Sequence, residues 1–330
     1  VIHVLDASRC VNVANQLLTR ADDIQKKTKQ EYESLRQVRA GKKRQRNLLS
    51  PEQARANRLQ LDWASFDPVA PLQEGIHVFD RYPLRELFPY IDWTPFFISW
   101  RMKGKFPAIL DDPKMGKEAQ KLFDEAQEML QSIASGNWLQ AKAVIGFFPA
   151  HSEEDSVVLD PGNGAEIRID FGRQRKKKAP GLPNLSLSDY IAPKSSGKRD
   201  YIGCFAVTTG LGIEQKVKEF EEKGDDYSAI LLKSLADRLA EALAERMHER
   251  VRKEFWAYAP KEQLDNSALI KENYQGIRPA PGYPACPDHK QKEVIFELLD
   301  VPNNAHIHLT ENLAMYPAAS VSGWYFAHPE

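Results

Sequence analysis

Four side chains with chemically useful groups lie in one short stretch of the chain, residues 276–289. They are a guanidinium (Arg278), a phenol (Tyr283), a thiol (Cys286) and an imidazole (His289). The same fourteen residues contain four prolines and two glycines, which excludes a helix or a central strand. Because proline fixes the backbone, the stretch is predicted to be a stiff, extended loop. From its residues alone, such a loop is a structural crossover as readily as a clamp for a ligand.

A lone carboxylate, Asp92, stands among aromatic residues in the segment 90–97. Removing a carboxylate from water costs free energy unless a hydrogen-bond donor or a cation compensates it. Asp92 therefore either caps the segment that follows it or meets a cationic group of a ligand. The residues alone favour neither alternative.

The longest helix is predicted between residues 227 and 258. Apolar residues recur at steps of four, with alanines beside them: Leu231, Leu235, Leu239, Leu243, Met247, Val251 and Phe255, then Ala236, Ala240 and Ala244. This pattern is typical of a helix that packs in a core, so it needs no functional explanation.

The same helix carries an acidic row, also at steps of four: Asp237, Glu241, Glu245 and Glu249. Like charges at that spacing destabilise a helix slightly, although neighbouring arginines and a lysine offset much of the cost. We interpret Glu245 and Glu249 as solvated. The charge pattern alone assigns no role to Asp237 or Glu241.

The motifs for metals and dinucleotides are incomplete. Cys286 and His289 give only two metal ligands, and His306 and His308 lack acidic or thiolate partners close by. The segment 210–212 lacks the third glycine and the downstream acid of a dinucleotide loop. We predict neither a structural metal nor a dinucleotide site.

The composition narrows the class of protein. The 330 residues carry a net charge of −1, so no bulk field favours nucleic acid or an anionic membrane. Charged residues make up 28% of the chain, and no apolar run approaches the roughly 18 residues of a membrane span. A signal peptide is not expected, because no basic region precedes the apolar start. Three cysteines far apart in sequence predict a reducing compartment, which makes the cytoplasm the expected location.

The expected fold class is α+β, with a mostly antiparallel, bent sheet flanked by helices and one long core helix. Two strand-like segments, 157–159 and 167–171, flank the turn sequence Pro-Gly-Asn-Gly, which predicts an antiparallel hairpin. Further strands are predicted at 77–79, 144–149, 201–207, 306–310 and 320–326, and further helices at 83–90, 111–135 and 292–300. Residues 173–178 are predicted to form a basic surface loop.

Three regions are expected along the chain. Residues 1–20 contain one strand and one helix, which cannot form a core and so indicate the remnant of a neighbouring domain. Residues 21–59 are a polar linker with helices, in which Ser50 and Gln53 form the ends of a predicted capping box. The main domain is expected over residues 60–330.

Several of these strings resemble a single family. Arg-Pro-Ala-Pro-Gly-Tyr-Pro-Ala-Cys-Pro-Asp-His (278–289) resembles the S-adenosylmethionine-binding signature of the activation domain of cobalamin-dependent methionine synthase. Ile-Asp-Trp-Thr-Pro-Phe-Phe (91–97) and Ala-Asp-Arg-Leu-Ala-Glu-Ala (236–242) are similar to further motifs of that domain. Val-Leu-Asp-Ala-Ser-Arg (4–9) is similar to the last strand and loop of the preceding cobalamin-binding domain. The resemblance covers essentially the whole chain.

The resemblance implies roles for individual residues. Arg278 would bind the carboxylate of S-adenosylmethionine, and Asp92, with Glu241 as a further candidate, would compensate its ammonium. Gly282 and Tyr283 would lie against the nucleoside, as part of a backbone that offers fixed carbonyls and amides. Ala7 would approach the corrin of cobalamin. No catalytic residue is implied, because the cofactors supply the reactivity.

The resemblance also implies cofactors and partners. Cobalamin would be bound mainly by the preceding domain of the same polypeptide, and zinc would belong only to modules absent from this sequence. A flavodoxin or flavodoxin-like reductase would supply the electron for reactivation of cob(II)alamin, with S-adenosylmethionine as the methyl donor. The parent enzyme transfers a methyl group from 5-methyltetrahydrofolate to homocysteine. The family continues beyond the residue aligned with Glu330 into a segment with paired aromatics, which this sequence lacks.

Two alternatives belong to other classes of protein. One is a docking domain for a flavodoxin-type reductase that has no ligand of its own. The other is a free-standing S-adenosylmethionine methyltransferase, which would need a base or nucleophile beside the sulfonium; the sequence indicates none.

Overall fold

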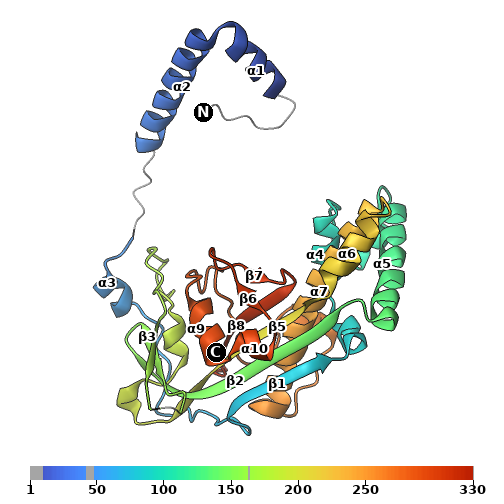
Figure 1. The fold of residues 1–330 in the computed structure, drawn as a ribbon. Helices are drawn as coiled ribbons and strands as arrows, with labels where there is room; N and C mark the ends of the chain where they lie inside the picture. Colours follow the sequence, from blue (N-terminus) through green and yellow to red (C-terminus); the bar gives the residue numbers. More distant parts are fainter. Residues whose placement is uncertain (1–9, 42–47, 163, 330) are drawn as a thin grey trace. The chain divides into compact units, whose positions relative to one another are not determined.

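The computed structural model describes residues 10–41, 48–162 and 164–329 (Figure 1). The chain divides into two compact units: Val1–Gln53 with Arg175–Leu182, and Ala54–Gln174 with Pro183–Glu330. The strand predicted at residues 1–5, and Ala7, lie outside the described residues. No helix in the described part of the chain combines the length and apolar character needed to cross a bilayer.

The smaller unit is helical and polar. It contains α1 (Cys10–Thr19) and α2 (Ala21–Gly41), and the acidic side chains of Asp22 and Asp23 in the first turn of α2 suit the positive end of the helix dipole. The backbone of Leu49 is hydrogen-bonded to Arg175, with N–O 2.8 Å. This bond joins the two chain segments that make up the unit.

Helix α3 (Pro51–Ala56) begins with the predicted capping box. The amide of Gln53 donates to Ser50 Oγ over 3.2 Å, and the amide of Ser50 donates to Gln53 Oε1 over 3.0 Å. Two amides that the helix itself cannot satisfy are thereby satisfied by side chains.

The larger unit is built on one sheet whose strands pair only in the antiparallel sense. Its strands are β1 (Gly75–Tyr82), β2 (Gln140–Glu153), β3 (Ser156–Leu159), β4 (Ile167–Asp170), β5 (Asp200–Leu211) and β8 (Ser320–Tyr325). Their order is β4-β3-β2-β5-β8, and β1 pairs with the first half of β2 on the edge that β3 occupies farther along. The hairpin β3–β4 confirms the pairing predicted from the turn sequence. The fold class α+β is confirmed.

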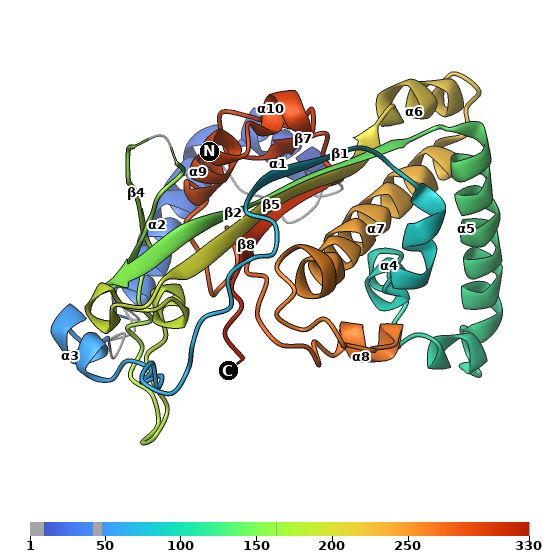
Figure 2. The ribbon, with the colours of Figure 1, turned by 90° about the horizontal axis from the view of Figure 1, so that it is seen from below.

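Both faces of this sheet are buried, as its alternating residues show. Ala143, Ile145 and Phe147 of β2 belong to one core, and Val144 and Phe148 belong to another. Figure 2 shows α7 (Asp226–Arg250) and α5 (Gly116–Gly136) on one side of β2 and β5, and α9 (Gln291–Leu298) and α10 (Val301–Asn304) on the other. An antiparallel strand covered on both faces reads as a continuous apolar run rather than as an alternation.

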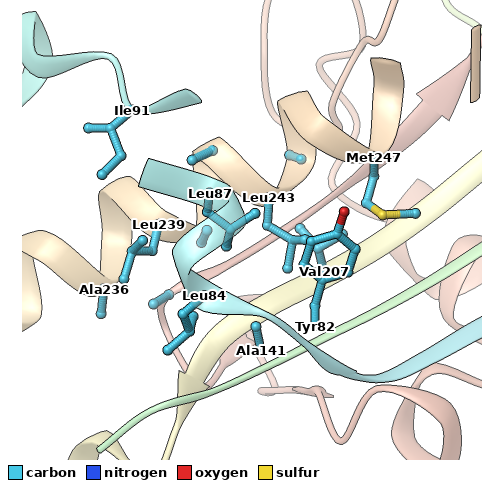
Figure 3. Packing of buried hydrophobic residues seen from close by; sticks show 14 of the residues in the cluster. Tyr82, Leu84, Leu87, Ile91, Ala141, Val207, Ala236, Leu239, Leu243 and Met247 are labelled. Atoms are coloured by element: carbon cyan, nitrogen blue, oxygen red, sulfur yellow. The ribbon is translucent and has the colours of Figure 1, made fainter. Parts of the chain in front are cut away.

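The long helix α7 (Asp226–Arg250) lies at the centre of the first core. Asp225 caps it by accepting a bond from Ser228 N over 3.0 Å. Figure 3 shows Leu84 and Leu87 of η2 (Leu84–Tyr90), together with Ile91, packed against α7 residues that include Ala236 and Leu239. The predicted helix to residue 258 is wrong in its last turns, which form a π-helical segment, η6 (Val251–Phe255).

The remaining elements surround the sheet. They are η2 (Leu84–Tyr90), α4 (Trp93–Ser99), η3 (Ala108–Asp111), α5 (Gly116–Gly136), η4 (Leu187–Tyr190), η5 (Lys194–Ser196), α6 (Ile213–Glu221), α8 (Asn266–Ile270), α9 (Gln291–Leu298), α10 (Val301–Asn304), β6 (His308–Leu309) and β7 (Met315–Tyr316). The strand predicted over 306–310 shortens to two residues, because His306 has φ = 55°, which does not fit a strand.

The sequence predicted a basic surface loop over residues 173–178, but Arg173 is buried. Its guanidinium is buried, with Nε 2.7 Å from Asp155 Oδ1 and Nη2 2.6 Å from Asp189 Oδ1. Nη1 also donates to the carbonyl of Asn184 over 2.7 Å. These contacts join the β2–β3 turn, the chain after β4 and η4.

We expect Arg173→Ala to lower the free energy of unfolding by about 3–5 kcal/mol, because it leaves two carboxylates without their buried partner. The measurement is urea denaturation followed by circular dichroism. Lys177→Ala, which truncates an exposed cation four residues away, serves as the control and should change the value by about 0.5 kcal/mol or less. An equal loss in both variants would contradict the structural role of Arg173.

Candidate ligand-binding site

The loop 276–289 is attached to the free edge of β8. Ile277 and Phe326 exchange backbone hydrogen bonds of 3.0 and 3.1 Å, and Trp324 N donates to Pro279 O over 2.9 Å. A proline cannot donate such a bond, but its carbonyl can accept one, as that of Pro279 does, while Ile277 both donates and accepts. The loop therefore has a fixed position although it contains no helix or strand.

The thiol and the imidazole of the loop support its shape. Cys286 Sγ donates to Gln291 Oε1 over 3.0 Å, and burial raises the pKa of this thiol to about 12, which disfavours a reactive thiolate. Gly282 has φ = 100°, and a Cβ added there would lie 2.3 Å from Cε1 of His289. Glycine at 282 thus permits both the left-handed backbone and the close approach of the imidazole.

Two cavities meet beside this loop. The larger, with a volume of about 560 Å³, lies against the loop, and its lining includes Tyr274, Tyr283 and residues 276–280. The smaller, of about 280 Å³, lies between the start of α4, α7 and α8, and is lined by Asp92 and Asn266. The residues that line both cavities are Glu241, Glu272 and Arg278.

Four of the six predicted site residues line these two cavities. Arg278 and Glu241 line both cavities, Tyr283 lines the larger one and Asp92 lines the smaller one. Gly282 belongs to the same loop but does not line either cavity. Ala7 lies outside the described residues.

Arg278 is held by α7. Its Nη2 donates to Glu245 Oε2 over 3.0 Å, and the two side chains are only 18% and 14% exposed. Its Nε is buried and has no hydrogen-bond partner in the structure. Because Arg278 also lines both cavities, the rest of its side chain is available to a group that lies in them.

A second guanidinium lies behind this pair. Arg252 is completely buried and binds Glu262 through Nε and Nη2, with distances of 2.7–3.1 Å. Its Nη1 is 3.9 Å from Glu245 Oε1, and its guanidinium lies 4.2 Å from the ring centre of Tyr274. Charges of alternating sign thus run from Glu262 through Arg252 and Glu245 to Arg278.

The prediction that Glu245 and Glu249 are solvated is wrong. Burial raises the pKa of Glu245, although the guanidinium groups of Arg278 and Arg252 act in the opposite direction. Glu249 is also buried, and it accepts bonds from Tyr90 and Lys253 of 2.5 and 3.2 Å. Burial alone would raise the pKa of Glu249, but these bonds bring it below its ordinary value.

Asp92 caps α4. Its Oδ1 accepts a hydrogen bond from the amide of Thr94 over 3.0 Å, and its backbone is extended, as an N-cap requires. The capping alternative is thus confirmed. Since Asp92 also lines the smaller cavity, the cap and a contact with a ligand are compatible.

Sequence reasoning missed Glu272, Tyr274 and Asn266. Asn266 is the first residue of the short helix α8, and Glu272 and Tyr274 lie in the irregular segment between α8 and the loop. No periodicity or motif marks a site in this part of the sequence. Glu245 was detectable as a member of the acidic row, but its burial depends on contacts distant in sequence. Across the described residues, no group of three or more His, Cys, Asp or Glu side chains is suited to a metal ion.

The arrangement suits a ligand that carries both an anion and cations. The guanidinium of Arg278, which lines both cavities, can donate hydrogen bonds to a carboxylate. Carboxylates around it can compensate an ammonium or another cation. The other lining residues are mostly apolar, and they include the aromatic rings of Tyr274 and Tyr283, which suit a flat heterocycle.

The chain is similar to known proteins in sequence and in fold. The family model described as "Vitamin B12 dependent methionine synthase, activation domain" matches residues 83–330. The chain is also similar to a solved structure, the MetH reactivation domain bound to AdoHcy, with 48% sequence identity and a TM-score of 0.82. That similarity covers 86% of this chain and 87% of the solved one.

Proposed function

This chain belongs to the activation-domain family of vitamin B12 dependent methionine synthases, and we propose that it binds S-adenosylmethionine in the two cavities that meet at Arg278. The observation that carries the proposal is the solved relative, 48% identical, which is bound to AdoHcy, the demethylated form of that ligand. The activation domain reactivates the B12 enzyme, and the methyl group of S-adenosylmethionine serves this purpose.

The residues present fit such a ligand. The cavities of about 560 and 280 Å³ have the size of small-molecule sites. Arg278 lines both cavities and forms an ion pair with Glu245, and this position supports a ligand carboxylate as a further partner of its guanidinium. Glu241 has no ion-pair partner among the described residues, which supports a cationic group of the ligand close to it.

We assign the ends of the ligand accordingly. The carboxylate would share the guanidinium of Arg278 with Glu245. The ammonium would lie toward Asp92 and Glu241. The nucleoside would lie in the larger cavity against the backbone near Gly282, with Tyr283 as a wall; this side chain is 63% exposed before any ligand binds.

The protein's contribution is to bind, orient and shield the methyl donor. Cobalamin, bound mainly by the preceding domain of the same polypeptide, supplies the metal that accepts the methyl group. Ala7, proposed to approach the corrin, is outside the described residues. A flavodoxin or flavodoxin-like reductase is the proposed electron donor. The parent enzyme is a methyltransferase of methionine biosynthesis.

We expect Arg278→Ala to weaken the binding of S-adenosylmethionine by about 2–5 kcal/mol, because the ligand carboxylate would be left in a partly desolvated site. Arg278→Lys should restore only part of this, since an ammonium cannot reproduce the planar fork. Isothermal titration calorimetry is the measurement.

Arg278→Ala also removes the partner of Glu245, so a folding control is needed. The double variant Arg278→Ala, Glu245→Gln removes the unpaired carboxylate and should unfold at a temperature closer to that of the parent. If it binds S-adenosylmethionine as tightly as the parent does, Arg278 does not bind the carboxylate.

Asp92→Asn separates the cap from a contact with the ligand. Asparagine is as good an N-cap as aspartate, so the melting temperature should be preserved. The affinity for S-adenosylmethionine should fall by about 1.5–3 kcal/mol, the range for a hydrogen bond to a charged group. An unchanged affinity would restrict Asp92 to its capping role.

A reconstitution test distinguishes the proposed function from its alternatives. We expect methyl transfer from S-adenosylmethionine only when a cobalamin-binding domain with reduced cobalamin is supplied, because the chain positions the donor and contributes no nucleophile of its own. The readout is the visible spectrum of cobalamin together with the formation of S-adenosylhomocysteine. Transfer to another acceptor would favour a free-standing methyltransferase, and absence of any binding would favour a docking domain.

A further inference from the structure

Arg252 carries a charge that is completely removed from solvent, in a rare kind of backbone. Its side chain is 0% exposed, and it belongs to the π-helical segment η6 that follows α7. Short π-helical segments are uncommon and occur frequently at functional sites. Replacing a buried ion pair by apolar residues is often neutral or stabilising, so stability of the fold alone does not explain why a charge is present here.

Glu262 fixes the plane of this guanidinium. Nε of Arg252 donates to both carboxylate oxygens of Glu262, over 2.9 and 3.1 Å, and Nη2 donates to Oε1 over 2.7 Å. The backbone closes the same turn, because Ala259 N donates to Arg252 O over 2.9 Å and Glu262 N donates to Ala259 O over 3.1 Å. A bidentate pair between a planar guanidinium and a carboxylate defines orientation as well as distance.

The guanidinium of Arg252 lies over the ring of Tyr274, 4.2 Å from its centre. A cation in this position is attracted to the face of an aromatic ring, most strongly where water is excluded. The imidazole of His248 also contacts the ring, with the two centres 4.9 Å apart and the planes at 86°. Tyr274 lies in a bend outside any helix or strand, so these side-chain contacts define the orientation of its ring.

Tyr274 lines the larger cavity, where the nucleoside of the ligand is proposed to lie. Because Arg252 is completely buried, the face of the ring that it covers is not the part that borders the cavity. Burial raises the pKa of Tyr274 to about 12, so the ring is uncharged at neutral pH. An uncharged aromatic ring held in one orientation suits packing against a flat heterocycle.

We propose that Arg252 is a positioning residue for the binding of S-adenosylmethionine, because it holds the ring of Tyr274 in place as a wall for the nucleoside. The inference rests on the proposed function. Arg252 does not touch the ligand, and its effect on affinity passes through Tyr274. The two arginines thus serve different ends of the ligand, Arg278 the carboxylate and Arg252 the nucleoside.

A second route from Arg252 to the ligand leads through Glu245. Nη1 of Arg252 is 3.9 Å from Glu245 Oε1, and Glu245 binds Arg278. This contact is longer than a hydrogen bond, whereas the contact with the ring of Tyr274 is close. The experiment therefore has to separate the nucleoside end of the ligand from its carboxylate end.

The test is a double-mutant cycle on the dissociation constant of S-adenosylmethionine, measured by calorimetry. Arg252→Met is combined with Glu262→Gln, so that no buried carboxylate loses its partner. We expect this pair of changes to weaken binding about three- to tenfold, and Tyr274→Leu to weaken it by a similar factor. Added to Tyr274→Leu, the pair of changes should have little further effect, since the two sites act as one. Losses that multiply overturn the proposal.

A ligand without an amino-acid end examines the route. 5′-Methylthioadenosine keeps the nucleoside of S-adenosylmethionine and lacks its carboxylate and ammonium. Its affinity should fall in Arg252→Met, Glu262→Gln by the same factor as that of S-adenosylmethionine. If only S-adenosylmethionine binds more weakly, Arg252 acts through Glu245 and Arg278, and the proposal is overturned. If the pair variant does not fold, Arg252→Lys, which keeps the buried charge and loses the planar fork, replaces it in both measurements.

Arg250→Met with Glu254→Gln is the matched control. Arg250 also lies at the end of α7, binds Glu254 over 2.9 Å and lies over two aromatic rings, those of Phe79 and Phe255, at 5.0 and 5.1 Å. These rings line neither cavity, so the affinity for S-adenosylmethionine should be unchanged. An equal fall would assign the effect to a general disturbance of this end of the helix, against the proposal.

The two levels of inference fail in different ways. If the parent chain binds no S-adenosylmethionine at all, the proposed function itself fails. If the parent binds it and the losses from Arg252 and Tyr274 multiply, this inference alone is refuted.

Discussion

The ion pair between Arg278 and Glu245 connects the loop to the core of the protein. One partner comes from a segment without regular structure and the other from the longest helix, and their Nη2 and Oε2 atoms lie 3.0 Å apart. A buried charge is tolerated only when it is paired, so this contact restricts where the loop lies along α7. Arg252 and Glu262 extend the alternation of charge behind it, which keeps the whole series close to neutral. The ion pair thus holds the loop beside α7, where loop residues form part of the wall of the larger cavity.

The rigidity of α7 in turn depends on the sheet. Ala236, Ala240 and Ala244 are buried on its inner face, and small side chains allow a helix to approach closely. Thr209 of β5 donates its hydroxyl to Ala236 O over 2.8 Å, a direct polar link from the sheet to the helix. One face of β2 and β5 packs in the same core as α7, and the other face packs in the second core. A shift of α7 would therefore disturb both the first core and the sheet.

Sequence reasoning succeeded where the cause is local. The capping box at Ser50, the β3–β4 hairpin and the leucine row of α7 depend on residues a few positions apart. It failed where the cause is distant. A spacing of four residues advances about 40° around a helix, because 3.6 residues make a turn. The acidic row therefore winds from the surface into the interior, from Asp237 at 62% exposure to Glu249 at 11%. The partners of Arg173 and the position of Glu272 are equally invisible to periodicity.

The attachment of the loop to β8 has a further consequence, for the behaviour of the chain in concentrated solution. β8 is the last strand in the order of the sheet, and an open edge of this kind is a template on which other chains can add strands and aggregate. The backbone bonds from Ile277 and Pro279 occupy that edge at Phe326 and Trp324, and Pro279 and Pro281 lack the amide needed to continue the ladder. The loop that forms the ligand cavity thus also protects the sheet against intermolecular pairing. Selection for recognition and selection for colloidal stability act on the same residues.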